Sequence, residues 1–209
     1  MDKLYLMILI LMVILSISHF RYFFNLPKRL RIISILVSFS ILSKAVSHII
    51  LFYADSLNYI FILKPFISLG LIYIPLISFL TIVILTKKNR LNGKIYICIL
   101  LISALLYSIS FRFDYNIVLT KGYVYSIRYS NSLFYQIYFY LSVTVFILGI
   151  DYLSKIKENK LYYLFLLSAF ASIIDSVLYI YNISMLPENL AGDLCFIILF
   201  NIVLNKIRK

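Results

Sequence analysis

The feature that most constrains this chain is a succession of long apolar runs separated by polar connections. A helix that crosses about 30 Å of hydrocarbon needs about 20 mostly apolar residues, because each residue advances about 1.5 Å. Seven runs meet or approach this length, and 63% of the 209 residues are hydrophobic while only 13% are charged. So few polar residues cannot cover this apolar excess in water. We therefore expect an integral membrane protein, not a soluble enzyme, a disordered chain or a disulfide scaffold.

The predicted fold is all-α, a single bundle of seven transmembrane helices that occupies residues 1–209. The third run is long enough to tilt or kink, and Pro75 inside it offers a place for the kink. The one long connection, Arg112–Tyr135, has 24 residues. The predicted segments are Leu4–Phe20, Ile32–Ala54, Tyr59–Thr86, Ile95–Phe111, Gln136–Leu153, Leu161–Tyr181 and Leu194–Ile207.

The basic residues predict the orientation of the bundle, because short cytoplasmic loops carry an excess of Lys and Arg. Of the 20 Lys and Arg residues, 14 would lie on one face of the membrane, and the opposite face would carry four: Lys3, Arg112, Lys121 and Arg128. We therefore expect an exported N-terminus, a cytoplasmic C-terminus and a multi-pass location in the cytoplasmic (inner) membrane, with the bilayer as partner and no nucleic acid. The heavier charge after the first run also favours a retained helix over a cleaved signal peptide. The 14 residues are Arg21, Lys28, Arg29, Arg31, Lys87, Lys88, Arg90, Lys94, Lys155, Lys157, Lys160, Lys206, Arg208 and Lys209.

Three ionisable residues fall inside the predicted spans, where charges are costly and normally face a bundle interior. Lys44 and Asp175 would lie about 18 Å and 21 Å from the inner ends of their helices, and Lys64 at a similar level. His48 and Tyr179 share helix faces with Lys44 and Asp175. Two interpretations stay open. The five residues form a ligand site near the outer face, or Asp175 forms an ion pair with one of the lysines that only fixes helix register, while Lys64 reaches the surface.

The sequence lacks the common catalytic and metal-binding patterns. There is no glycine-rich phosphate loop, no His-Glu-x-x-His, no Gly-x-Ser-x-Gly and no Cys-x-x-Cys. Cys98 and Cys195 lie in apolar runs, and His19 and His48 are expected near opposite faces of the membrane. We therefore expect no enzyme activity, no catalytic residues, no metal and no cofactor.

Three stretches of the chain resemble the seven-transmembrane sensor region at the N-terminus of many bacterial histidine kinases. They carry a Gly, Tyr, Pro and Phe pattern in the third segment, aromatic clusters around the start of the fifth, and an acidic-aromatic pattern in the sixth and seventh. The stretches are Gly70–Phe79; Gly122–Tyr125, Leu133–Tyr135 and Tyr138–Tyr140; and Ile174–Tyr179 with Pro187 and Asp193–Phe196.

The resemblance implies a sensor or receptor-type module of bacterial signal transduction, which would read a small extracellular ligand or the state of the envelope. Two features depart from the family. Asp175 stands where the family usually has Asn, and the chain ends at Lys209 where the family continues into a catalytic domain. We therefore expect a module without its own output, which would act through a separate cytoplasmic kinase or other signalling protein. The alternative is a small substrate-binding or transport subunit of a membrane transporter.

Overall fold

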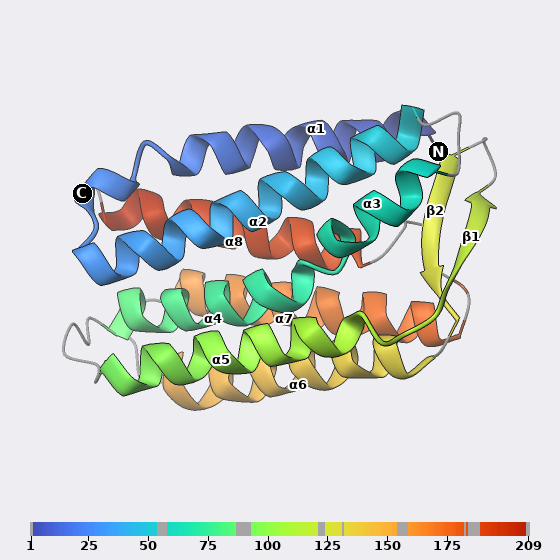
Figure 1. Ribbon diagram of the computed structural model, residues 1–209. Helices are drawn as coiled ribbons and strands as arrows, with labels where there is room; N and C mark the ends of the chain where they lie inside the picture. Colours follow the sequence, from blue (N-terminus) through green and yellow to red (C-terminus); the bar gives the residue numbers. More distant parts are fainter. Residues whose placement is uncertain are drawn as a thin grey trace.

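The computed structural model describes residues 2–53, 58–86, 93–120, 124–130, 132–153, 159–181, 183 and 189–207. The described chain is predominantly helical, and its helices run back and forth along one direction, with a small hairpin at one end of the bundle (Figure 1). The helices are α1 (Asp2–His19), η1 (Phe23–Asn25), α2 (Lys28–Tyr53), α3 (Asn58–Ile67), α4 (Gly70–Thr86), α5 (Gly93–Ser110), α6 (Ser132–Leu153), α7 (Asn159–Ile180) and α8 (Leu190–Ile207). The strands are β1 (Tyr115–Thr120) and β2 (Val124–Tyr129).

Five helical segments of the described chain are long and apolar enough to cross a membrane. They correspond to the first, second, third, fifth and sixth predicted segments. The fourth forms a shorter apolar helix, Ile95–Ser110, and the seventh forms the 18-residue α8. This helical content supports the prediction of a multi-pass membrane protein. The five spans are Lys3–Asn25, Lys28–Tyr53, Ile62–Thr86, Ser132–Asp151 and Lys160–Ile180.

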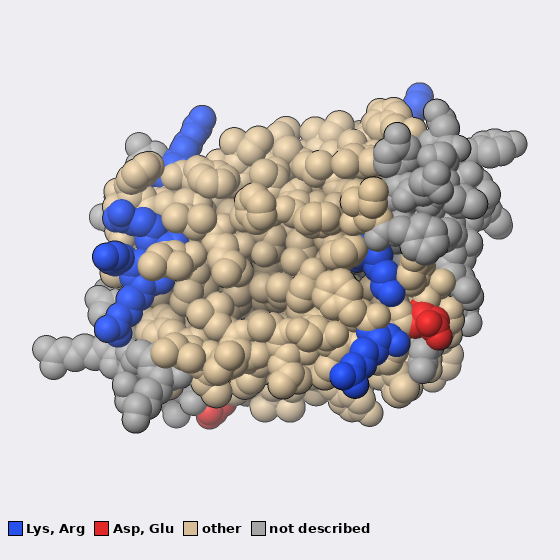
Figure 2. Space-filling view, in the orientation of Figure 1, with Lys and Arg blue, Asp and Glu red and all other residues tan. Residues whose placement is uncertain are grey.

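The distribution of polar and apolar side chains also fits a lipid environment. Large apolar side chains face outward along the bundle; Met7, Phe39 and Leu101 are 70%, 64% and 64% exposed. On the face drawn in Figure 2, a broad uncharged band separates two ends that carry Lys and Arg. Many buried positions hold hydroxyl residues; the Ser142 hydroxyl, for example, donates to the Tyr138 carbonyl at 2.8 Å. Such bonds satisfy buried polar groups where no water is present.

The third predicted segment is divided into α3 and α4, and the break lies before Pro75, the position that the sequence offered for a kink. The helix ends at Ile67 and resumes at Gly70, whereas Pro75 lies inside α4, which continues through it. Pro65 lies inside α3, two residues before its end, and weakens the turn that precedes it because proline has no amide hydrogen to donate. The Leu71 amide then donates to the Ser68 carbonyl at 3.1 Å in a tighter turn.

The long connection contains the antiparallel hairpin β1–β2, which the analysis of apolar length did not predict. Its register runs from Tyr115 opposite Tyr129 to Thr120 opposite Val124. β2 packs against α2, so the hairpin is attached to one end of the bundle. The strands are rich in the β-branched and aromatic residues that favour extended structure. They are too short to register as membrane spans, which is why a criterion of helix length passed over them.

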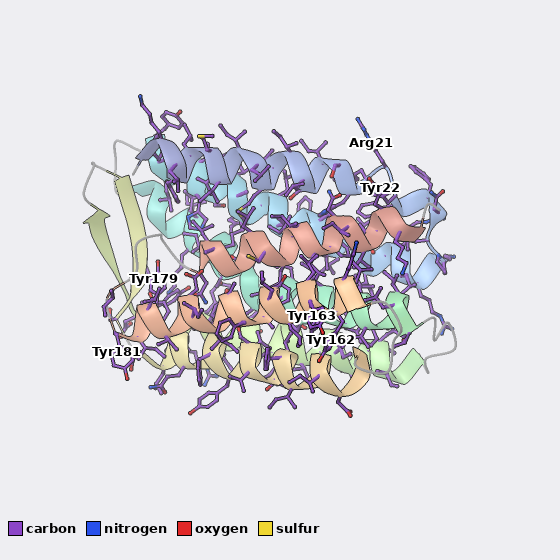
Figure 3. All side chains as sticks on the ribbon, turned by 180° about the vertical axis from the view of Figure 1, so that it is seen from behind. Arg21, Tyr22, Tyr162, Tyr163, Tyr179 and Tyr181 are labelled. Atoms are coloured by element: carbon purple, nitrogen blue, oxygen red, sulfur yellow. The ribbon has the colours of Figure 1, made fainter. Side chains whose placement is uncertain are left out.

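The two ends of the bundle differ in charge. The α1–α2 connection, the start of α7 and the end of α8 share the end opposite the hairpin (Figure 1). Arg21 and Tyr22 lie at that end in Figure 3, whereas Tyr179 and Tyr181 lie at the hairpin end of α7. The described basic loop residues are therefore grouped as the sequence predicted. Several basic residues of the predicted loops lie outside the described residues: Lys87, Lys88, Arg90, Lys121, Lys155, Lys157, Arg208 and Lys209. Pro187, from the stretches that carry the family resemblance, also lies outside them.

The helix α4 forms the centre of the bundle. It packs against α2, α5, α6 and α8. Buried residues make up 67% of the most apolar 18-residue stretch of its span, Ile62–Thr86, compared with 28–50% in the four other spans. A helix that is apolar on all sides and surrounded by others belongs to a core. The polar residues described next therefore reach this centre from the helices around α4.

Candidate functional site

A buried ion pair joins α2 to the first turn of α8. The Lys44 ammonium nitrogen lies 2.6 Å from the Oδ2 atom of Asp193. The two side chains are only 1% and 0% exposed. Isolated buried charges are strongly disfavoured, so each of these groups depends on the other. The pair therefore couples two helices that are far apart in the sequence.

The absence of a side chain at Gly70 makes room for this pair. A β-carbon at Gly70 would overlap the Tyr138 hydroxyl and would lie 3.3 Å from the Lys44 nitrogen. The same nitrogen lies 5.9 Å from the centroid of the Tyr73 ring, within the range of a cation–π interaction. Gly70 begins α4 directly after the break in the third segment. The break thus brings Lys44, Tyr138 and the start of α4 together.

Asp175 has a different partner from the one expected. Its Oδ2 atom accepts a hydrogen bond from the Gly192 amide at 2.9 Å. The first amides of a helix lack partners within the helix, and its N-terminus favours negative charge, so a half-buried carboxylate is stable there. Of the two interpretations left open, the ion pair of Asp175 with Lys44 is not formed, because Lys44 pairs with Asp193, and the described residues show no ion pair of Asp175 with Lys64. Asp175 still interacts electrostatically with both members of that pair.

Lys64 and His48 lie beside different groups. The Lys64 ammonium donates to the Phe113 carbonyl at 3.2 Å and lies 4.2 Å from the centroid of the Tyr115 ring. It therefore ties α3 to the start of the hairpin. His48 is buried one helical turn after Lys44, and its Nδ1 atom is hydrogen-bonded to the Tyr5 hydroxyl at 3.1 Å. This bond links α2 to α1.

Tyr179 joins the hairpin end of α7 to α6. Its ring stacks on that of Tyr135, with centroids 4.8 Å apart and an interplanar angle of 17°. The Tyr135 hydroxyl in turn accepts a hydrogen bond from the Tyr129 amide at 3.1 Å. The five predicted site residues therefore occupy the hairpin half of the bundle, but their contacts divide them. Lys44, Asp193 and the nearby Asp175 form an ionic cluster. Lys64, His48 and Tyr179 instead connect neighbouring elements.

Two residues of the cluster, Asn189 and Asp193, were not among the predicted site residues. Asn189 precedes α8 with a φ of 52°, a conformation that Asn tolerates better than most residues. Its side-chain amide donates to the Ser176 hydroxyl at 3.2 Å, and its backbone carbonyl accepts from the Asp193 amide at 3.0 Å. Asn before a helix and an acid in its first turn are a known start signal. That signal would have placed the start of α8 four residues before the predicted Leu194.

The cluster contains more buried acceptors than donors can satisfy. The Oδ1 atoms of Asn189 and Asp193 are buried and have no hydrogen-bond partner among the described residues. Asn189 is 3% exposed and Asp193 is 0% exposed. A buried acceptor without a partner costs about 1–3 kcal/mol. Asn189 directly precedes α8 and Asp193 lies in its first turn, so both atoms belong to the junction at which this helix starts.

A small cavity adjoins these groups. It has a volume of about 10 Å³ and is lined by Phe134, Tyr135, Tyr138 and Asn189. This volume is close to the minimum that accommodates a single water molecule. The Tyr138 hydroxyl also lies against Gly70, beside the Lys44 ammonium, so the cavity is close to the ion pair.

Close packing fixes α7 against α8 at this level. A β-carbon at Gly192 would lie 2.6 Å from the α-carbon of Ser172, which shows how near the two backbones are. The Ser172 and Ser142 hydroxyls are hydrogen-bonded at 2.8 Å, and this bond extends the contact to α6. Small residues permit such approach between membrane helices. A change at the first turn of α8 therefore acts on α7 as well as α2.

The described residues include no group of three or more His, Cys, Asp and Glu side chains that could hold a metal ion. Cys98 is exposed and Cys195 is half-buried, and both are free thiols. What the site offers chemically is therefore charge pairing and hydrogen-bond acceptance. Comparison with protein-family models, with curated proteins and with solved structures found no match to this chain.

Proposed function

We propose that the chain is a membrane-embedded sensor or receptor-type module of signal transduction. The observation that carries this proposal is the buried pair of Lys44 and Asp193, which attaches the first turn of α8 to α2. α8 runs from this pair, near the hairpin, to the basic end of the bundle (Figure 1). A ligand or envelope change that alters the pair at one end therefore displaces a helix whose other end faces a different compartment.

The proposal includes seven spans, an exported N-terminus and a cytoplasmic C-terminus in the cytoplasmic membrane. The grouping of basic residues opposite the hairpin supports this orientation. It is tested with single cysteines at two exposed positions, Ser130→Cys beside the hairpin and Lys160→Cys at the start of α7, after both native cysteines are changed to serine. A membrane-impermeant maleimide added to intact cells should label the first variant and spare the second. Labelling of the second variant alone would reverse the orientation.

The signalling mechanism requires two states of the bundle that bind the stimulus differently. In the resting state the Lys44–Asp193 pair holds α8 against α2. Loss of the pair leaves two buried charges without partners, and α8 shifts until they are solvated or paired again. Because Gly192 packs directly on Ser172, α7 guides that movement.

This movement is measured as a distance between spin labels at the basic end. Labels on Lys160→Cys in α7 and Asn205→Cys in α8, both exposed, should change their separation when Lys44→Met breaks the pair. The matched control places labels on Asp151→Cys and Lys160→Cys, in helices that the pair does not join. An unchanged separation between α7 and α8 in Lys44→Met would contradict the mechanism.

The class of function is tested by purification of the chain from native membranes in mild detergent, with mass spectrometry of the proteins that remain bound. A cytoplasmic kinase or another signalling protein at the basic end would support the sensor proposal. An ATPase or transporter subunit would replace it with a role in transport.

A further inference from the structure

We propose that the turn between α1 and α2 binds an anionic phospholipid, with the headgroup phosphate on its basic side chains and Phe24 among the neighbouring lipids. The site goes beyond the proposed function, because it requires only that the bundle spans a membrane and not that the chain transmits a signal. Three features of the turn carry the inference: its local structure, its charge and its place at the end of the apolar band.

The local structure of the turn directs one aromatic ring outward. Phe23, in η1, and Leu26, directly after it, are buried, at 4% and 3% exposure. Three residues complete one turn of a 3₁₀-helix, so positions three apart share a face. Phe23 and Leu26 therefore face the bundle, whereas Phe24 between them is 80% exposed. An aromatic ring exposed to this extent gains free energy when lipid replaces the water around it.

Arg31 fixes the turn in this conformation. Its Nε atom donates to the Phe23 carbonyl at 2.9 Å, and its Nη2 atom donates to the carbonyls of Phe24 and Leu26 at 2.9 Å and 3.2 Å. The centre of its guanidinium group lies 6.0 Å from the centroid of the Phe24 ring. Hydrogen bonds from a charged donor are among the stronger ones in proteins. Arg31 is therefore a structural residue of the turn, and its bonds hold Phe24 in the outward direction.

The charge of the turn favours an anionic ligand. Arg21, Lys28 and Arg29 flank η1 and are exposed. No acidic residue lies between Phe20 and Ile32, and the structure shows no ion pair of these three side chains with a described acidic residue. α2 begins at Lys28, and the N-terminus of a helix adds positive potential. A phosphate supplies the counter-charge that the turn lacks.

The turn also lies at the level where headgroups meet hydrocarbon. The span Lys3–Asn25 ends at it and the span Lys28–Tyr53 begins after it. Basic side chains gather at this end of the uncharged band in Figure 2, and in Figure 3 Arg21 projects away from the ribbon. Basic and aromatic residues at the ends of spans lie within reach of headgroups and of the upper hydrocarbon. An acidic protein would match the charges, but it would have to displace lipid from beside Phe24, so we assign the site to a lipid.

The test uses the absence of tryptophan from the sequence, because Phe24→Trp then places a single indole at the turn. The variant is reconstituted in nanodiscs of phosphatidylglycerol and phosphatidylcholine in a fixed ratio, with brominated acyl chains on one lipid at a time. Bromine quenches indole fluorescence at short range, so the two samples report which lipid lies beside the turn. We expect a preference for phosphatidylglycerol of at least about fivefold, the attraction of one basic residue to an anionic surface. Salt at about 1 M should reduce it, because charges are then screened over about 3 Å.

Matched variants locate the preference. Tyr53→Trp provides the positional control, since Tyr53 is 65% exposed at the hairpin end of α2, and its preference should be clearly smaller. In the Phe24→Trp chain, Lys28→Gln together with Arg29→Gln should lower the preference to less than about twofold. Arg112→Gln removes an exposed basic residue at the hairpin end and should leave the preference unchanged. All of these side chains are exposed, so the fold should tolerate the changes.

Three results would overturn the site. Equal quenching of Phe24→Trp by the two lipids would show that the turn does not select an anionic headgroup. No quenching by either lipid would place the ring outside the bilayer and favour an acidic protein as the occupant. An unchanged preference after removal of Lys28 and Arg29 charge would refute the assigned phosphate ligands. None of these results depends on the spin-label distance between α7 and α8, so the lipid site and the sensor mechanism are tested separately.

Discussion

Removal of one member of the Lys44–Asp193 pair should destabilise the bundle far more than loss of a surface ion pair. We consider Lys44→Met, which keeps a long unbranched side chain and removes the charge. Both native side chains are almost fully buried, so solvent provides no substitute partner. In the variant the Asp193 carboxylate loses its cation, and its Oδ1 atom already has no hydrogen-bond partner among the described residues.

The expected loss is about 3–5 kcal/mol in the free energy of unfolding, the range for one partner removed from a buried pair. An exposed pair would give at most about 1 kcal/mol. Asp193→Asn should produce a loss of similar size, because it leaves the Lys44 ammonium buried without a counter-charge. The double variant Lys44→Met, Asp193→Asn contains neither charge and should recover most of the stability. The coupling energy between the two positions should therefore be at least about 2 kcal/mol.

The assay is equilibrium unfolding of the purified chain in mixed micelles, in a double-mutant cycle. A second cycle, Lys44→Met with Asp175→Asn, provides the control, because Asp175 is hydrogen-bonded to the Gly192 amide and interacts with Lys44 only at longer range. Its coupling should be clearly smaller. The reasoning would be refuted if this second cycle gave the larger coupling, or if Lys44→Met cost less than about 1 kcal/mol.

Two glycines provide further predictions. Gly192→Ala should cost about 1–3 kcal/mol in unfolding free energy, because the new β-carbon meets the backbone of Ser172 at 2.6 Å. Ser108→Ala, at an exposed position of α5, is the comparison. No loss relative to that comparison would contradict the close contact of α7 with α8. Gly70→Ala should also destabilise the fold, because the new β-carbon overlaps the Tyr138 hydroxyl. Adding Tyr138→Phe to this variant removes that hydroxyl and should recover part of the lost stability. The same micelle assay measures both variants, and additive losses would contradict this packing.

Apolar length alone predicted most of the helices, because membrane hydrocarbon imposes a minimum span that is legible in the sequence. The observed α2, α6 and α7 begin two to four residues before the predicted second, fifth and sixth segments, and most of the added residues are polar or aromatic. Helix ends are set by backbone hydrogen bonds and local capping, which hydropathy does not record. The hairpin was missed for a related reason, since its strands are stabilised by pairing with each other.

The sequence also identified Lys44 as a buried charge and predicted that it faces the bundle interior, because an unpaired ammonium in lipid is too costly. It could not identify the partner. Asp175 lies at a suitable depth by helix rise, but depth along a helix axis does not give the direction of a side chain. The three-dimensional packing decided in favour of Asp193, since the close approach at Gly192 brings the first turn of α8 beside α7 and leaves Asp175 facing its amides.

What the sequence by itself determined is the helical class of the chain, its apolar exterior and the separation of basic from less basic loops. These properties follow from composition along the chain and from the solvent around it. Only the tertiary structure decided which buried groups meet: the pair across α2 and α8, the cavity beside Asn189 and the break at Gly70 that makes room for Lys44. Such contacts depend on the rotation of each helix about its axis. Packing against neighbouring helices sets that rotation, and no single segment of the sequence contains it.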